Sequence, residues 1–209
     1  MGDVVVVDYG SGNVRSMVNA LKKVAAPGQS VLLCREPEAI TGGERVVLPG
    51  VGAFAEVRRK LDASGVLPAL QKARDAGVPL LGICVGMQVL ADEGFEFETT
   101  RGLGWVPGTV KQLEVPAGTK LPHFGWSPVT PTRPHPLFDG LAAGSQFYFV
   151  HSFALGCHES ADVAATAEYG GRFTAAIARN NVVGTQFHPE KSDTAGLALL
   201  ANFCRWSTR

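Results

Sequence analysis

The chain has 209 residues, and its 19 lysines and arginines balance 19 aspartates and glutamates, so the formal net charge is zero. This length favours one domain over residues 1–209, and a hydrophobic fraction of 45% supports one large core. Zero net charge argues against nucleic acid as the main partner. The chain has no basic signal segment, which argues against secretion. It also lacks the roughly 20 consecutive apolar residues that span a bilayer, which argues against a membrane function. We therefore expect a cytoplasmic protein.

Four apolar runs alternate with helical patterns in the first half of the chain. The runs predict strands at residues 3–8, 31–34, 45–48 and 78–83. Apolar residues at helical spacing predict helices at residues 14–24, within 53–76 and at 85–92. Uninterrupted apolar runs are typical of strands buried on both faces, and their alternation with helices predicts an α/β fold with a mostly parallel central sheet flanked by helices.

The second half of the chain has frequent turns and short strand patterns. These predict strands at residues 147–150, 162–166, 173–177 and 182–187. Little helical periodicity separates them, so we expect antiparallel strands added to the parallel core. A last helix is predicted at residues 194–206.

A cysteine motif, Gly82-Ile83-Cys84-Val85-Gly86, lies where a buried strand is predicted to turn into a helix. Its spacing matches the G-x-S-x-G nucleophile elbow with sulfur in place of oxygen, and its glycines permit a tight turn. The following helix N-terminus favours a thiolate. Alone the motif also fits a buried structural cysteine. The other three cysteines have no metal-ligand spacing, so we expect free thiols and no metal.

A second motif, His188-Pro189-Glu190, follows the predicted strand at 182–187. Proline favours an extended residue before it, and in extended chain residues i and i+2 point to the same side. Glu190 would then orient His188, which would deprotonate Cys84. The tripeptide alone also fits a surface turn. Together the two motifs are more specific, because both follow core strands, at the sheet edge where ligands bind in α/β folds.

Backbone groups and one amide complete the predicted site. The loop Pro49-Gly50-Val51-Gly52 follows the third strand, and its N–H groups, with that of Val85, suit an oxyanion hole; an ordinary turn is the alternative. Gln88, four residues after Cys84, is predicted to face the same side, as a substrate ligand or a backbone cap. The loop Gly10-Ser11-Gly12 lacks the third glycine of a dinucleotide loop, so we expect no nucleotide cofactor.

Together, three motifs resemble the class I (triad) glutamine amidotransferases over essentially the whole chain: Pro49-Gly50-Val51-Gly52, Gly82-Ile83-Cys84-Val85-Gly86-Met87-Gln88 and Thr185-Gln186-Phe187-His188-Pro189-Glu190-Lys191-Ser192. Three further segments, at residues 8–13, 121–126 and 148–153, resemble the subfamily of glutaminase subunits of imidazole glycerol phosphate synthases. The resemblance implies a flavodoxin-like α/β fold, hydrolysis of L-glutamine without a cofactor, and delivery of ammonia to a (β/α)₈-barrel cyclase partner in histidine biosynthesis.

The same resemblance implies roles for individual residues. Cys84 is the implied nucleophile, His188 the acid and base, and Glu190 its orienting partner. The implied oxyanion hole comprises Val51, Gly52 and Val85. The residues implied to bind glutamine are Gly50, Gly52, Gln88, Glu96 and Ser152. Those implied to face the partner are Asn13, Arg15, Trp126 and Lys191.

This sequence departs from the subfamily pattern at a few positions. Val85 stands where leucine is usual, and it would act through its backbone. Phe124 and Ser127 stand where methionine and asparagine are common, which leaves the ammonia passage open, and Phe153 replaces a common tyrosine. Three alternatives also stay open: the glutaminase subunit of another amidotransferase, a stand-alone γ-glutamyl cysteine hydrolase, and a non-catalytic binding module.

Overall fold

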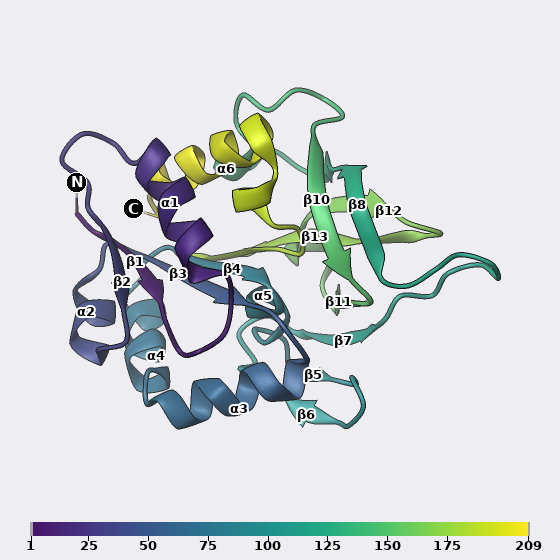
Figure 1. The fold of residues 1–209 in the computed structure, drawn as a ribbon, viewed down its shortest axis with the longest axis horizontal. Coiled ribbons are helices and arrows are strands. Elements are labelled where there is room, and N and C mark those ends of the chain that lie inside the picture. The colour runs from purple at the N-terminus through teal and green to yellow at the C-terminus, as the bar shows by residue number, and fades with distance from the viewer. Residues whose placement is uncertain (1, 209) are drawn as a thin grey trace.

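An eight-stranded sheet organises the chain, of which this computed structural model describes residues 2–208 (Figure 1). The strand order is β2-β1-β3-β4-β14-β13-β12-β9. The first five strands are parallel, and each of the last three pairs antiparallel with the strand before it in this order. The strands are β1 Val4–Val7, β2 Val31–Cys34, β3 Arg45–Gly50, β4 Leu80–Cys84, β9 Thr130–Pro131, β12 Val163–Glu168, β13 Arg172–Arg179 and β14 Val182–Thr185. The predicted α/β class and its antiparallel extension are confirmed.

Helices cover both faces of the parallel part of the sheet, which explains its uninterrupted apolar strands. α1 and α6 lie together on one face, and α2, α3 and α4 lie on the other (Figure 1). Every residue of β1 and β4 is consequently buried. The helices are α1 Val14–Val24, α2 Pro37–Gly42, α3 Phe54–Ser64, α4 Leu67–Asp75, α5 Val85–Gln88 and α6 Asp193–Arg205.

Two smaller sheets, in which most strand pairs are antiparallel, lie beside the end of β4. One pairs β10 with β8, and the other has the order β11-β7-β5-β6. Their strands are β5 Glu93–Gly94, β6 Thr100–Arg101, β7 Gly108–Gln112, β8 His123–Pro128, β10 Gln146–His151 and β11 Phe153–Cys157. Three 3₁₀ turns complete the described chain: η1 Pro136–Phe138, η2 Ser160–Asp162 and η3 Pro189–Lys191. Of these, only β10 was predicted from the sequence.

The predicted helix at 85–92 is wrong beyond Gln88, because the next N–H groups do not make i to i−4 bonds: Leu90 and Ala91 donate to the Met87 and Gln88 oxygens (3.1 and 3.0 Å), and Asp92 donates to the Gly108 oxygen (3.0 Å). The backbone N–H of Leu103 donates to the Val89 oxygen (2.7 Å), and those of Trp105 and Val106 donate to the Leu90 oxygen (2.8 and 3.0 Å). These bonds satisfy two carbonyl groups that follow the end of the helix and have no partner within it. None of the helices in residues 2–208 is long and apolar enough to cross a membrane.

Candidate active site

Cys84 occupies a strained turn between β4 and α5. Its φ of 54° and ψ of −116° lie outside the regions that a residue with a side chain ordinarily adopts. The flanking glycines permit this turn by close backbone contact. A Cβ added at Gly86 would lie 2.0 Å from the Leu48 carbonyl oxygen, and one at Gly50 would lie 2.4 Å from the Gly86 nitrogen. The elbow expected from the Gly-x-Cys-x-Gly spacing is thus present.

His188 and Glu190 form a buried pair, with His188 Nδ1 2.9 Å from Glu190 Oε1. His188 is extended, as predicted, but residues 189–191 form the 3₁₀ turn η3 rather than extended chain. The ring of Pro189 fixes φ near the value that begins a helical turn, which explains the difference. The i and i+2 side chains nevertheless meet. Helix α6 packs closely against this turn, since a Cβ added at Gly196 would lie 1.9 Å from the Pro189 carbonyl oxygen.

The surroundings of His188 favour its protonated form. Burial alone lowers the pKa of the imidazole, but hydrogen bonds with Cys84 and Glu190, and the negative charges of both, outweigh it and raise the pKa to about 10. With Nδ1 directed at the carboxylate, Nε2 is the nitrogen left for the sulfur. The arrangement is suited to an imidazolium held between a thiolate and a carboxylate.

A cavity of about 200 Å³ lies over the sulfur of Cys84, a volume below that of drug-sized pockets. It is lined by Val51, Gly52, Cys84, Val85, Gln88, Glu96, Val150, His151, Ser152, Phe153 and His188. Eight of the sequence-predicted site residues are in this lining. Gly50 and Glu190 are not: Gly50 packs beneath the elbow, and Glu190 lies behind His188.

The two longest polar side chains predicted to bind substrate are already anchored. Gln88 Nε2 donates to the Phe153 carbonyl and to Gln186 Oε1, both at 2.9 Å. Its own Oε1 is therefore left as an acceptor toward the cavity. Glu96 Oε2 accepts the Phe54 N–H at 2.8 Å, at the start of α3. Both side chains thus offer oxygen atoms of fixed position to a ligand with N–H donors.

The glycine loop after β3 is tied to the loop after β1. Ser11 Oγ donates to the Val51 carbonyl oxygen at 2.8 Å, and the Val51 N–H is directed at Ser11 Oγ at 3.4 Å. This N–H, predicted for the oxyanion hole, is therefore engaged by Ser11. The sequence offered only a weak signal for this contact, because Gly10-Ser11-Gly12 lies 40 residues from Val51.

Sequence reasoning placed His151 beside the presumed pocket without a role, and it gave no role to Gln186 or His123. Gln186 Nε2 donates to Cys84 Sγ at 3.7 Å, and the imidazoles of His123 and His151 are joined at 3.1 Å between Nδ1 and Nε2. His151 also lines the cavity. These residues stand inside quoted motifs, but nothing in the sequence indicates that they contact one another.

The residues predicted to face a partner are exposed and lie on two neighbouring regions. Trp126 and Lys191 flank the ring of Tyr148, with ring centroids 6.1 Å apart for Trp126 and the lysine Nζ 5.5 Å from the Tyr148 centroid. Asn13 accepts the Ser16 N–H and starts α1, where Arg15 also lies, and α1 contacts η3.

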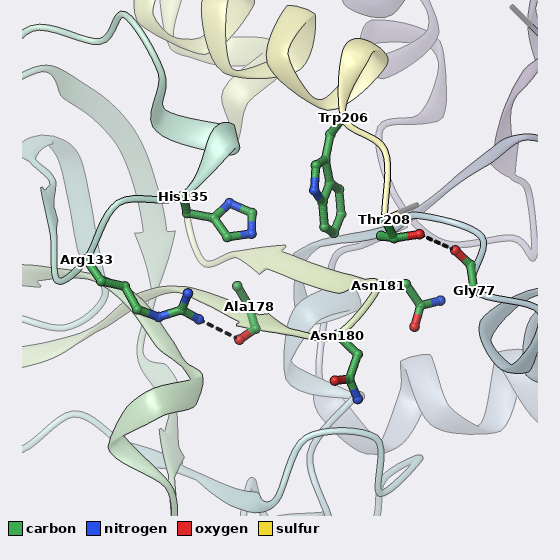
Figure 2. Close-up of a pocket in the computed structure, with 8 residues that line it drawn as sticks. All are labelled: Gly77, Arg133, His135, Ala178, Asn180, Asn181, Trp206 and Thr208. Atoms are coloured by element: carbon green, nitrogen blue, oxygen red, sulfur yellow. Dashed lines mark hydrogen bonds between the residues drawn. The ribbon is translucent and has the colours of Figure 1, made fainter.

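A second cavity, of about 500 Å³, lies at the opposite end of the parallel strands (Figure 2). Its polar side chains mostly satisfy backbone groups. Arg133 donates to the Ala178 and Ala161 oxygens, Thr208 to the Gly77 oxygen, and Asn181 to the Arg74 and Val78 oxygens. None of the predicted site residues lines this second cavity. The residues predicted to be catalytic or to bind substrate lie instead around the carboxyl end of β4.

Comparison with known proteins agrees with this geometry. A family profile described as glutamine amidotransferase class-I matches residues 5–206. The chain belongs to the class I glutamine amidotransferase family. This amidotransferase is 50% identical over 211 residues to an imidazole glycerol phosphate synthase subunit HisH from Caulobacter vibrioides, covering 99% of each chain. It is 48% identical to the subunit of that name from Rhodospirillum rubrum, covering 98% of this chain and 99% of that one.

Among solved structures, the PurLQS complex from Thermotoga maritima contains a chain that matches this amidotransferase with a TM-score of 0.72 at 18% identity, covering 97% of each chain. At that identity the likeness supports the fold alone. The HisH relatives, in contrast, place this amidotransferase in their subfamily.

Proposed function

We propose that this chain is the glutaminase subunit of imidazole glycerol phosphate synthase, which hydrolyses L-glutamine and supplies ammonia to a (β/α)₈-barrel cyclase in histidine biosynthesis. The observation that carries the proposal is the contact of His188 with both Cys84 and Glu190 beside a cavity of about 200 Å³. Near full-length identity of 50% to a HisH subunit supports the same assignment. We expect the subunit to act in the cytoplasm.

The chemistry follows from the positions of these groups. The Cys84 thiolate attacks the side-chain amide carbon of glutamine, and the carbonyl oxygen becomes an oxyanion. His188 gives its proton to the amide nitrogen, the C–N bond breaks, and ammonia leaves behind a γ-glutamyl thioester. His188 then takes a proton from water as the water oxygen attacks the thioester carbon; the C–S bond breaks, glutamate is released, and the Cys84 thiolate and His188 imidazolium are regenerated. Glu190 holds His188 in the orientation that both proton transfers require.

Backbone donors are expected to stabilise the two oxyanions. The N–H of Val85, directly after the nucleophile, is one proposed donor, and the loop of Val51 and Gly52 supplies the other. The Val51 N–H is engaged by Ser11 in the isolated chain. This supports a resting state with an incomplete oxyanion hole, which the loaded partner completes, so that ammonia is not released without an acceptor.

The substrate orientation follows from the charges of the cavity. The carboxylate of Glu96 and the free amide oxygen of Gln88 suit the α-ammonium group of glutamine. Ser152 adds a small polar side chain to the lining of the cavity. The proposed partner face comprises Trp126 and Lys191 around Tyr148, with Asn13 and Arg15 on α1.

Glutamate release from glutamine tests the proposal. The purified chain is assayed alone, with the barrel cyclase, and with the cyclase and its ribonucleotide ligand. We expect weak activity alone and a steep rise only in the last mixture. Full activity alone, indifferent to the cyclase, contradicts the proposal and indicates an independent hydrolase.

The matched variant for this assay is Cys84→Ser, which changes one atom of the nucleophile. We expect it to lose glutamate release by at least about a thousandfold, because an unactivated hydroxyl is a far weaker nucleophile than a thiolate. Its assembly with the cyclase should be unchanged. Retained glutaminase activity in the folded variant would eliminate Cys84 as the nucleophile.

A further inference from the structure

Gln186 directs a hydrogen-bond donor at the sulfur of Cys84. It lies directly after β14, and its side chain is completely buried. Its Nε2 is 3.7 Å from Cys84 Sγ, within the range for a bond to sulfur, and its Oε1 is 2.9 Å from Gln88 Nε2. The mechanism above gives this residue no task, although it contacts the reacting atom.

The direction of this amide is fixed by a carbonyl group outside the elbow. The Phe153 oxygen can only accept, so the Gln88 group facing it at 2.9 Å is the NH₂. The same NH₂ also faces Gln186, so the Gln186 group turned toward it must be the carbonyl oxygen. The NH₂ of Gln186 is therefore the group that faces the sulfur. Flipping either amide would place two donors or two acceptors against each other.

The Phe153 carbonyl is in turn held by a second chain of buried groups. His151 donates its Nδ1–H to this oxygen at 2.9 Å, which leaves Nε2 as an acceptor for the Nδ1–H of His123 at 3.1 Å. The remaining nitrogen of His123 accepts the hydroxyl of Ser127 at 2.9 Å. Every bond in this chain has one possible direction while both imidazoles are neutral, and burial lowers the pKa of each to about 4.

We propose that Gln186 is a further catalytic residue of the glutaminase reaction, which stabilises the Cys84 thiolate by donating its Nε2–H to Sγ, with Gln88 and the Phe153 carbonyl fixing the direction of that donor. The thiolate then has two donors, Gln186 and His188, on the same sulfur. Stabilisation of the anion helps twice, in forming the attacking thiolate and in expelling it from the thioester. This inference rests on the proposed function only in taking Cys84 as the nucleophile.

Alkylation of Cys84 tests the proposal without glutamine or a partner. The full chain is treated with iodoacetamide between pH 5 and 10, and mass spectrometry follows the peptide that contains Cys84. Gln186→Met keeps the length of the side chain but removes the donor. We expect the pH of half-maximal alkylation to rise by about one unit, which corresponds to a tenfold change in the thiol–thiolate equilibrium.

Two variants make this result specific. Gln29→Met removes another buried glutamine, whose Nε2 donates to the Cys204 oxygen at 3.2 Å in a different part of the core, and should leave the Cys84 midpoint unchanged. Gln186→Glu keeps the shape and the acceptor toward Gln88 but replaces the donor with oxygen. It should raise the midpoint by at least as much as Gln186→Met, and it serves if the methionine variant does not fold.

A folded Gln186 variant whose midpoint stays within about 0.3 units of the original overturns the proposal, because a merely structural role changes the folded fraction and not the midpoint. The test is also separable from the proposed function. A chain that releases no glutamate, but whose midpoint still responds to Gln186→Met, refutes the proposed function and leaves this inference standing. Partner-dependent glutaminase activity, together with an alkylation midpoint that Gln186→Met leaves unchanged, supports the proposed function and refutes this inference.

Discussion

At the scale of single residues, the elbow that holds Cys84, the proposed nucleophile, depends on the absence of a side chain at Gly86. A Cβ there would lie 2.0 Å from the Leu48 carbonyl oxygen and 3.0 Å from the Pro49 carbonyl carbon. Both are backbone atoms of β3, so no side-chain rotation relieves the contact. We expect Gly86→Ala to displace the elbow, to cost about 1–3 kcal/mol of unfolding free energy, and to lower glutamate release by about a hundredfold or more.

Gly42→Ala is the matched control for this prediction. Gly42 is the last residue of α2, and a Cβ there meets nothing within 4 Å. Since alanine favours helix over glycine, this variant should keep its activity and be equally stable or slightly more stable. Urea unfolding with the partner-activated glutaminase assay checks both variants. Equal activity of the two would contradict the role assigned to the close contact.

The sequence was informative about this elbow because the requirement is local. Gly82, Cys84 and Gly86 lie within five residues, and their spacing indicates a tight strand-to-helix turn. Gln186 was not predictable as a donor to Cys84. Its direction depends on Gln88 and on the carbonyl group of Phe153, which are brought together by three separate elements.

At the scale of elements, the pairing of β8 with β10 buries two neutral histidines. His123 and His151 face each other in this two-stranded sheet, and His123 also stacks on Phe149 and Tyr169. A proton added at His151 Nε2 would face the Nδ1–H of His123. Desolvation by burial already lowers the pKa of both histidines to about 4.

The sign of the pH dependence follows from these lowered pKa values. Between the unfolded pKa of about 6.5 and the folded pKa of about 4, the unfolded chain binds protons at these positions and the folded chain does not. Stability is therefore lost as the pH falls through this window. At pH 5 each histidine accounts for about 2 kcal/mol of lost unfolding free energy. His188 changes this slope little, because its raised pKa keeps it protonated in the folded state, and the unfolded state is at least half protonated throughout this window.

His123→Phe tests this prediction, since phenylalanine retains the stacking but cannot titrate. The variant will be less stable at pH 7, where it loses the bonds to Ser127 and His151, but its stability should fall less steeply between pH 6.5 and 5. Urea titrations across this range measure the slope. His158→Gln, at an exposed position, is the control and should keep the original slope. An unchanged slope for His123→Phe would exclude the histidine pair as the source.

Element boundaries show what local patterns cannot predict. Helix α1 has the predicted bounds, Val14–Val24, because the face that its apolar spacing predicts to be buried is the face that the fold buries. Helix α5 ends at Gln88, four residues before the predicted end, because the Asp92 N–H pairs with the distant Gly108 oxygen and not with Gln88. Strands β7, β8 and β11 carry no clean alternation and form by pairing with distant segments.

At the scale of the whole molecule, strand β10 connects the cavity to the aromatic surface. Its last residue, His151, lines the cavity, while Tyr148 on the same strand contacts Trp126 and Phe124 of β8. Phe124 and Trp126 are 68% and 45% exposed. Exposed aromatic clusters of this kind mark interaction surfaces in soluble proteins. The proposed partner would therefore cover a surface one strand away from the proposed glutaminase site, which would keep the path of ammonia short.

Trp126→Ala tests this surface as the site of assembly. Tryptophan is enriched among the residues that contribute most to binding, so we expect affinity for the barrel cyclase to fall at least about tenfold, with the unfolding free energy of the isolated chain nearly unchanged. Leu33→Ala is the control: Leu33 is 42% exposed, but it lies on β2, an edge strand of the eight-stranded sheet that is separate from the sheet of β8 and β10. Titration calorimetry with the cyclase separates the two variants. If Trp126→Ala binds as tightly as Leu33→Ala, the aromatic surface is not the interface, and partner activation must reach Val51 and Ser11 by another face of the molecule.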